Sequence, residues 1–229
     1  MERNTEALSE FGKTGHERVT RAMHALRSGL PVILVDDESR ENEGDLILAA
    51  EKVTAASMNF LIRNGSGIVC LALTPEQTDR LQLAPMVLEK SSRSQFVAAF
   101  TVSIEASKGV TTGVSAADRS RTIQAAIADD AKPSDLAKPG HIFPIRAEEG
   151  GVFSRPGHTE GSVDLTRLAG LKPAAAICEL MNSDGTMSRL PEIIQFARQH
   201  DLIVLSIPDI ISFRQNQVGS ISNEYRISA

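Results

Sequence analysis

The sequence predicts an α+β fold, a single three-layer α/β/α domain with a mixed β-sheet. Segments with strand patterns and segments with helix patterns alternate along the 229 residues. Some strand segments are continuously apolar and others alternate apolar with polar residues, which favours a mixed sheet covered by helices on both faces over a purely parallel one. No Pro-, Gly- or Ser-rich stretch is long enough to be a convincing linker. We therefore expect one domain over residues 1–229, with 1–15 and 214–229 peripheral.

The first half of the chain alternates helix and strand patterns with clear boundaries. Apolar residues at helical spacing that end at Gly29 predict the first helix, and Thr54 and Thr74 each occupy the N-cap position of a later one. Two short apolar runs enclose a strongly acidic segment, which predicts two strands joined by an acidic loop. In chain order we expect a helix at 16–28, strands at 31–35 and 46–50, a helix at 55–63, a strand at 68–73 and a helix from Pro75.

The second half begins irregularly and then alternates again. Residues 84–99 show no period, whereas 100–106 alternates as a half-exposed strand does. A loop rich in Gly, Thr and Ser precedes the next helix, and a Gly-rich turn follows the next strand. In chain order we expect a strand at 100–106, a helix at 116–128, a connector at 131–140, a strand at 141–149, a helix near 162–169, a strand at 174–181, a helix at 190–200, a strand at 202–207 and a helix at 209–217.

Composition and charge exclude several classes of protein. The chain has 24 Lys and Arg against 29 Asp and Glu, with eight Phe, one Tyr and no Trp. Outside residues 36–45 the basic and acidic residues balance, and a chain with this balance and few aromatic side chains does not suit nucleic acid. No apolar run approaches the roughly 20 residues of a membrane helix. The N-terminus has neither a signal-peptide nor a transit-peptide pattern, and Cys70 and Cys178 lie in separate apolar runs, as buried thiols do. We expect a cytoplasmic protein that binds neither nucleic acid nor membrane.

The most informative segment is the acidic decapeptide DDESRENEGD at 36–45, which holds six carboxylates and one arginine. It directly follows a predicted buried strand. The six carboxylates repel one another, and a cation bound among them would offset this repulsion. Oxygen ligands select hard cations such as Mg²⁺, Mn²⁺ or Ca²⁺. A solvated acidic loop is the simpler alternative. An EF-hand does not fit, because aligning Gly44 with the invariant glycine puts Ala50 where a bidentate Glu is required.

A second candidate site is the run Arg155-Pro156-Gly157-His158-Thr159. The arginine suits a phosphate or carboxylate, the glycine permits close approach to the backbone, and the histidine can ligate a metal. The run alone is a weak signal of function.

Two further residues attract interest by their surroundings. Glu179 stands in the apolar run AAAICELM, where an ionised carboxylate is either paired structurally or tuned as an acid or base. His141 opens a predicted strand directly after Gly140, and by itself it is better explained as a satisfied structural histidine than as a catalytic one. The turn Gly65-Ser66-Gly67 lacks the spacing of a dinucleotide-binding loop, so it receives no role at this point.

Taken together, these motifs resemble one known family. The strings DDESRENEGD, GSGIVCLAL, FTVSIEA, GVTTGVSAADR, AKPSDL, PGHIFPIRA, GGV, GHTE and AxxCELMNxDGTM occur in this order. From about residue 16 to 213 the chain resembles the 3,4-dihydroxy-2-butanone 4-phosphate synthase family of riboflavin biosynthesis. The resemblance implies a single α+β domain and a lyase that converts D-ribulose 5-phosphate into 3,4-dihydroxy-2-butanone 4-phosphate and formate. It also implies Mg²⁺ or Mn²⁺, with two ions per subunit, a homodimer, and the monofunctional form without a GTP cyclohydrolase II domain.

The resemblance also implies roles for individual residues. Glu41 and His158 match the ligands of the metal pair, and His141 and Glu179 match positions essential for catalysis. The positions that match substrate contacts are Arg40, Glu41, Asp45, Arg155, Pro156, Gly157, His158 and Thr159. The segment before residue 100 would cover the substrate.

These residue types suit the removal of a proton next to a ketone, because acid/base groups move the protons and a hard cation stabilises the enediolate oxygen. Another metal-dependent sugar-phosphate aldolase or hydrolase would use the same carboxylates, and formate as a product separates it from the lyase. A cation-binding or interaction protein without catalysis is the third possibility, and it would need Glu179 and His141 for stability alone.

Overall fold

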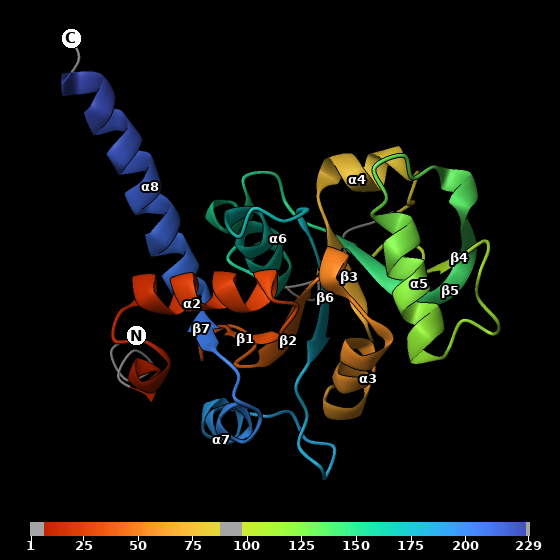
Figure 1. Ribbon diagram of the computed structural model, residues 1–229, viewed down its shortest axis with the longest axis horizontal. Helices are drawn as coiled ribbons and strands as arrows, with labels where there is room; N and C mark the ends of the chain where they lie inside the picture. Colours follow the sequence, from red (N-terminus) through yellow and green to blue (C-terminus); the bar gives the residue numbers. More distant parts are fainter. Residues whose placement is uncertain (1–6, 88–97, 228–229) are drawn as a thin grey trace.

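The sheet confirms the predicted mixed topology. A computed structural model of the chain describes residues 7–87 and 98–227, with side chains as far as residue 217. Within these residues seven strands form one sheet in the order β4-β5-β3-β6-β2-β1-β7 (Figure 1). The pairs β1–β7 and β3–β5 are parallel and the other four pairs are antiparallel. The strand bounds are β1 Val32–Val35, β2 Gly44–Ala49, β3 Cys70–Leu73, β4 Ile104–Ala106, β5 Leu136–Arg146, β6 Ala174–Glu179 and β7 Val204–Ser206.

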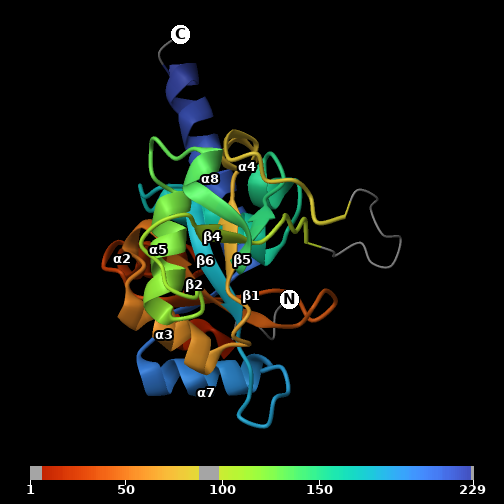
Figure 2. The ribbon, with the colours of Figure 1, turned by 90° about the vertical axis from the view of Figure 1, so that its right-hand side faces the viewer.

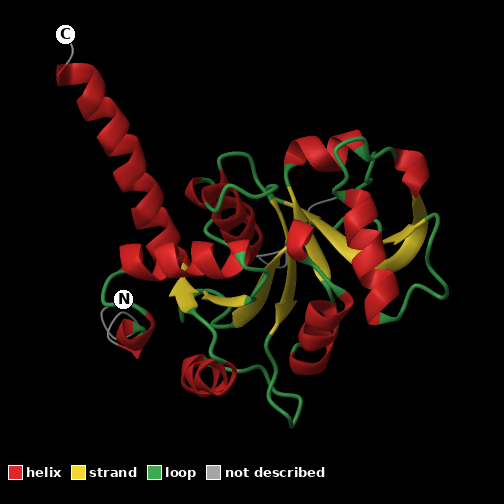
Figure 3. Ribbon diagram, in the orientation of Figure 1, coloured by secondary structure: helices red, strands yellow, loops and turns green. Residues whose placement is uncertain are grey.

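Helices cover both faces of this sheet, which confirms the three-layer α+β architecture (Figure 3). One core cluster packs α3, α5 and α7 on the first face, and a second packs α2, α6 and α8 on the other. The helix bounds are α2 Gly15–Arg27, α3 Ala55–Asn64, α4 Pro75–Arg80, α5 Ala116–Ala126, α6 His158–Leu168, α7 Leu190–His200 and α8 Ile207–Ile227. The short 3₁₀ turns are η1 Ser9–Phe11, η2 Ala50–Lys52, η3 Pro133–Asp135 and η4 Gly151–Phe153. None of the described helices is both long and apolar enough to cross a bilayer.

Side-chain caps explain where several of the helices begin. Thr54 and Thr74 each accept a hydrogen bond from the N–H three residues later, and the N–H of each threonine donates to the side chain of that same residue, which completes two capping boxes. Such a cap satisfies backbone donors that a helix start leaves without partners. The sequence signals at these two positions therefore located the helices correctly.

The acidic segment connects two neighbouring strands at the centre of the fold. Val35 at the end of β1 pairs with Gly44 at the start of β2, so residues 36–43 form the connection between them. Both strands are fully buried along their length. A buried antiparallel pair therefore holds the two ends of the acidic loop in place.

Helix α6 begins at His158 and not near 162 as expected. Its first nine residues, 158–166, are all buried, although most of them are polar. A helix that is buried on every side shows no alternation between an apolar and a polar face, so the periodicity that would have located its start is missing. The consequence is functional, because His158 occupies the first turn of a helix and not a loop.

Two strand boundaries also differ from the expectation. β5 begins at Leu136, because Leu136 and Ala137 pair with β4 at the edge of the sheet. Pro139, which belongs to the expected connector, is tolerated at this edge. β4 covers only Ile104–Ala106, and Phe100 and Thr101 make isolated bridges instead of a continuous strand. The alternating pattern at 100–106 therefore overstated the length of β4.

Both described ends of the chain contact the domain over part of their length. Leu8 and Phe11 are buried in the core, so the part of 1–15 that is described packs against the domain. Helix α8 continues past the expected end at 217, and its later turns extend away from the sheet (Figures 1 and 2). Arg214, at the start of the expected C-terminal segment, donates to Asp164 Oδ2 at 2.5 Å and so joins α8 to α6.

Candidate active site

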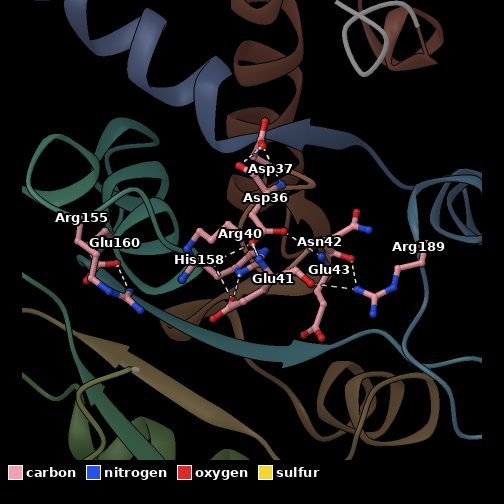
Figure 4. Close-up of polar contacts among 11 residues, drawn as sticks. Asp36, Asp37, Arg40, Glu41, Asn42, Glu43, Arg155, His158, Glu160 and Arg189 are labelled. Atoms are coloured by element: carbon pink, nitrogen blue, oxygen red, sulfur yellow. Dashed lines mark hydrogen bonds and ion pairs between the residues drawn. The ribbon is translucent and has the colours of Figure 1, made fainter. Parts of the chain in front are cut away.

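Asp36 closes the acidic loop on itself. Its side chain is fully buried; Oδ1 accepts the N–H of Glu43 at 2.8 Å, and Oδ2 accepts the N–H of Glu41 and Nη1 of Arg40, each at 2.9 Å (Figure 4). Both carboxylate oxygens are therefore engaged within the loop. The sequence analysis did not single out Asp36. The signal that could have found it is its position directly after a buried strand, where an Asp side chain can accept hydrogen bonds from backbone N–H groups of the loop that follows.

Glu41 and His158 meet next to this loop. Nδ1 of His158 lies 3.5 Å from Oε2 of Glu41, and Nη1 of Arg40 lies 2.7 Å from the same oxygen. Potential ligand atoms of Asp36, Glu41 and His158 all lie within 4.8 Å of one another, close enough to share a metal ion. Because the Asp36 oxygens already accept loop hydrogen bonds, Glu41 and His158 are the better candidate ligands.

Two buried atoms of the described residues have no hydrogen-bond partner, Asp45 Oδ1 and His158 Nε2. Burial opposes the charged form of His158, but the Asp45, Glu41 and Asp36 carboxylates outweigh it and raise the pKa of His158 to about 9. Burial, reinforced by neighbouring carboxylates, raises the pKa of Asp45 to about 7. Unsatisfied buried polar atoms call for an explanation, and a carboxylate oxygen and an imidazole nitrogen in a negative surrounding fit a bound divalent cation.

These residues border a cavity of about 410 Å³ on the face of the sheet that α6 covers. Asp45 on β2 and Glu179 on β6 are partners in the strand register, so the sheet itself brings the two carboxylates together. Residues far apart in the chain therefore meet here because of strand pairing. The lining residues are Arg40, Glu41, Glu43, Asp45, Cys70, Ala98, Phe100, Ile145, Arg155, His158, Thr159, Ile177 and Glu179.

The turn before α6 positions Arg155 at the rim of the cavity. Nη1 of Arg155 donates to Oε2 of Glu160 at 2.7 Å, and Oε1 of Glu160 accepts the N–H of Glu148 at 3.0 Å. A Cβ atom at Gly157 would overlap Arg155 Nη1, so a larger residue here would displace the arginine side chain from this position. Pro156 and Gly157 form the turn, whereas Arg155, His158 and Thr159 line the cavity.

The structure does not bring His141 to this cavity. His141 lies at the β4–β5 edge with its side chain 46% exposed, and its Nδ1 is 2.7 Å from Oε2 of Glu105. Oε1 of Glu105 accepts the hydroxyl of Thr122 at 2.6 Å. The histidine is therefore oriented by a carboxylate, but it borders no part of the cavity of its own chain.

Sequence reasoning missed several residues that line the cavity. Glu43 belongs to the acidic loop but received no separate role, and Cys70 was identified only as a buried thiol. Phe100, Ile145 and Ile177 carry no chemical signal in the sequence, because apolar strand residues look alike whether they face a cavity or the core. The expected covering segment falls largely on residues 88–97, which lie outside the described residues.

A larger cleft of about 840 Å³ lies where α4 and α6 approach the loop after β5. Its charged side chains are largely paired with one another: Arg146 with Asp79, Lys172 with Asp129 at 2.7 Å, and Arg167 with Asp164 at 3.5 Å. Neither of the two unsatisfied buried atoms belongs to this cleft. The smaller cavity is therefore the better candidate for chemistry.

The fold and the site together define a class of protein: an α+β enzyme scaffold whose cavity suits a hard divalent cation and a small anionic molecule. The model of the 3,4-dihydroxy-2-butanone 4-phosphate synthase family matches residues 20–213. The chain belongs to this family.

Similar proteins agree in sequence and in fold. A 3,4-dihydroxy-2-butanone 4-phosphate synthase from Shewanella woodyi is 61% identical over 212 residues, which cover 93% of this chain and 96% of that protein. A 3,4-dihydroxy-2-butanone 4-phosphate synthase solved in complex with two magnesium ions is similar with a TM-score of 0.83 and 41% identity, over 88% of this chain and 98% of that one. A two-domain synthase from A. baumannii is similar with a TM-score of 0.82 and 46% identity over 86% of this chain, but this chain covers only 57% of its length.

Proposed function

We propose that this chain is a divalent-metal-dependent lyase that converts D-ribulose 5-phosphate into 3,4-dihydroxy-2-butanone 4-phosphate and formate, in riboflavin biosynthesis. Family membership supports the reaction. The observation that carries the proposal for this chain is the cavity that gathers Glu41, Asp45, His158 and Glu179, with Asp45 Oδ1 and His158 Nε2 buried and unsatisfied. A purely structural cluster of carboxylates would satisfy such atoms within the protein.

Glu41 and His158 would hold the metal, which is Mg²⁺ or Mn²⁺ with two ions per subunit. A bound cation supplies charge stabilisation for the oxygen that becomes negative when a proton is removed next to a ketone. Carboxylate oxygens such as those of Glu41 suit both metals, and the two magnesium ions in a similar solved structure support the number.

The chain's own residues then divide the remaining tasks. Arg155, in the turn before α6, would bind the phosphate, because an arginine next to a helix N-terminus is suited to an anion. Arg40 and Asp45 would contact the sugar oxygens from the opposite side, and Thr159 would add a hydroxyl. Glu179, at the end of β6, would take a proton from the substrate and return it.

His141 requires a second subunit in this proposal. Because it borders no part of the cavity of its own chain and is 46% exposed, it would act from the partner in a homodimer. The exposed apolar side chains Ile68 and Val114 support a protein contact in this region, since Arg119 links the two segments through Gly67 O and Val114 O at 2.9 Å each. A cytoplasmic location is also part of the proposal, and the two free cysteines agree with a reducing compartment.

The test is to incubate the purified protein with D-ribulose 5-phosphate and Mg²⁺ and to measure formate. We expect formate and the four-carbon phosphate in equal amounts, loss of both on chelation, and recovery when Mg²⁺ or Mn²⁺ is returned. Release of inorganic phosphate without formate would instead support a hydrolase, and a pair of shorter carbonyl fragments would support an aldolase. Full activity in excess chelator would exclude the metal assignment.

A matched pair of variants locates the activity in the loop. Glu41→Gln removes one proposed ligand and should abolish formate release. Glu38→Gln changes an exposed carboxylate of the same loop that does not line the cavity, and it should leave formate release unchanged.

A further inference from the structure

The Gly65-Ser66-Gly67 turn, which the sequence left without a role, lies against the end of β6. The Ser66 N–H donates to the Glu179 carbonyl at 2.8 Å, and Gly65 bridges to Leu180. A Cβ atom at Gly65 would lie 2.5 Å from Sγ of Cys178 and 2.9 Å from the Glu179 carbonyl, and Gly67 has a φ of +79°. Both glycines are thus needed for the turn to approach the strand this closely.

The close approach brings one polar side chain of the turn against Glu179, which lines the cavity. Oγ of Ser66 lies 2.7 Å from Oε2 of Glu179 and donates its proton to it. The same Oγ accepts the N–H of Ile68 at 3.2 Å, and Sγ of Cys178 lies 3.6 Å away. Because a hydroxyl has a single proton and the Ile68 N–H already occupies one of its lone pairs, the proton is directed at the carboxylate.

We propose that Ser66 is a positioning residue that orients the Glu179 carboxylate toward the cavity through its hydroxyl. This inference rests on the proposed function, in which Glu179 moves a proton of the substrate. One carboxylate oxygen receives the Ser66 hydrogen bond, and this contact favours one rotamer of the Glu179 side chain at the end of the strand. The second oxygen is then presented to the substrate in a fixed direction.

The hydroxyl is separable from the fold of the turn. The hydrogen bond from Ser66 N–H to Glu179 O and the Gly65–Leu180 bridge are made by backbone atoms, so they persist when the side chain is shortened. Ser66→Ala therefore removes the contact with the carboxylate and keeps the turn. Ser66→Thr keeps the hydroxyl.

The experiment compares Ser66→Ala, Ser66→Thr and a control, Ser120→Ala, in steady-state formate release. Ser120 is buried in α5, donates to the Ala116 carbonyl at 2.7 Å and does not line the cavity. We expect Ser66→Ala to lower kcat roughly 10-fold, the size expected for a lost hydrogen bond to a charged group, with KM changed less than about twofold. Ser66→Thr should recover most of kcat, and Ser120→Ala should match the parent protein.

A double-mutant cycle separates this inference from the proposed function. Once Glu179→Gln has removed the proton carrier, Ser66→Ala should cause no further loss of kcat. An equal loss in both backgrounds, a change in KM alone, or a normal kcat for Ser66→Ala would contradict the positioning role while leaving the proposed function intact. Near-normal turnover of Glu179→Gln would contradict the proposed role of Glu179. It would also contradict the Ser66 inference, which depends on that role. Thermal unfolding of each variant checks that the fold is retained.

Discussion

At the residue scale, the sheet and helix α6 hold ionisable side chains close together in the site. Asp45 and Glu179 face each other on neighbouring strands, and the buried His158 provides the positive charge nearby. Burial favours the neutral form of Asp45, whereas His158 favours its charged form. Such opposed influences allow a small change, such as metal binding, to move protons within the cluster.

Glu179 carries the sharpest prediction at this scale. Glu179→Gln preserves the shape of the side chain and can still accept the Ser66 hydrogen bond, but it cannot carry a proton. The variant should fold, bind metal and bind ribulose 5-phosphate, while turnover falls roughly 10²–10⁴-fold, the usual contribution of a general acid or base. Glu149→Gln, an exposed carboxylate outside the cavity, is the control. Formate release near the parent rate would show that Glu179 is only a paired structural carboxylate.

The two thiols give a prediction with a defined pH dependence. Burial raises the pKa of Cys178 to about 11 and also raises the pKa of Cys70 above its usual value. Only the thiolate reacts, so a thiol with a raised pKa has low reactivity at pH 8. Its reactivity grows as the pH rises toward the pKa of the thiol. The folded protein should react with an aromatic disulfide reagent at least about 100-fold more slowly than the protein in denaturant. Rapid modification of the folded protein at pH 8 would contradict the buried-thiol assignment.

At the element scale, the acidic loop is held from within and from outside. Asp36 binds the loop backbone from within, and Arg189, which precedes α7, donates to the carbonyls of Glu41, at 3.0 Å, and of Asn42 (Figure 4). Asn42 adopts a φ of 55°, a left-handed conformation that needs support in a residue other than glycine. The guanidinium also offsets part of the repulsion among the loop carboxylates.

Arg189→Ala should therefore weaken metal binding without unfolding the protein. We expect the dissociation constant for Mn²⁺ to rise about 10-fold, at the lower end of the effect of residues that orient ligands. Free Mn²⁺ measured by electron paramagnetic resonance during a titration gives this constant directly. Arg198→Ala, within α7 and paired with Glu10 at 2.8 Å, is the control and should bind Mn²⁺ as the parent does. Equal affinity for Arg189→Ala and the parent would show that the loop needs no external support.

The elements that sequence patterns predicted well are those with local causes. Caps at Thr54 and Thr74, and the apolar runs on both sides of the acidic loop, depend on residues close together in the chain. The start of α6 was wrong because a fully buried helix has no polar face, and the start of β5 was wrong because its first residues depend on pairing with β4. Long-range pairing is not encoded in a local period.

The candidate site divides in the same way. Glu41, His158 and Glu179 stand in distinctive strings, and the structure brings all three to one cavity. The contributions of Asp36 and Ser66 depend on hydrogen bonds that form only in the folded chain, so the sequence did not point to them. His141 shows the opposite case, since a distinctive string predicted a catalytic residue that the fold of a single chain leaves outside the cavity.

At the scale of the whole molecule, the position of His141 makes the proposed homodimer part of the chemistry. If each cavity takes His141 from the partner, His141→Ala and Glu179→Gln should each be inactive, but a mixed dimer should contain one intact cavity. Random mixing of the two variants gives mixed dimers in about half of the molecules, so about a quarter of the parent activity should return. Refolding the two variants together and assaying formate measures this. No gain over the separate variants would contradict a shared site.

The most direct test of the central claim is to locate the metal by anomalous diffraction from crystals of the protein grown with Mn²⁺. The account predicts that the strongest peak lies within about 2.0–2.5 Å of a Glu41 carboxylate oxygen and a His158 ring nitrogen, bordering the cavity that contains Glu179. A strongest peak in the larger cleft between α4 and α6, with no density bonded to Glu41 and His158, would contradict it.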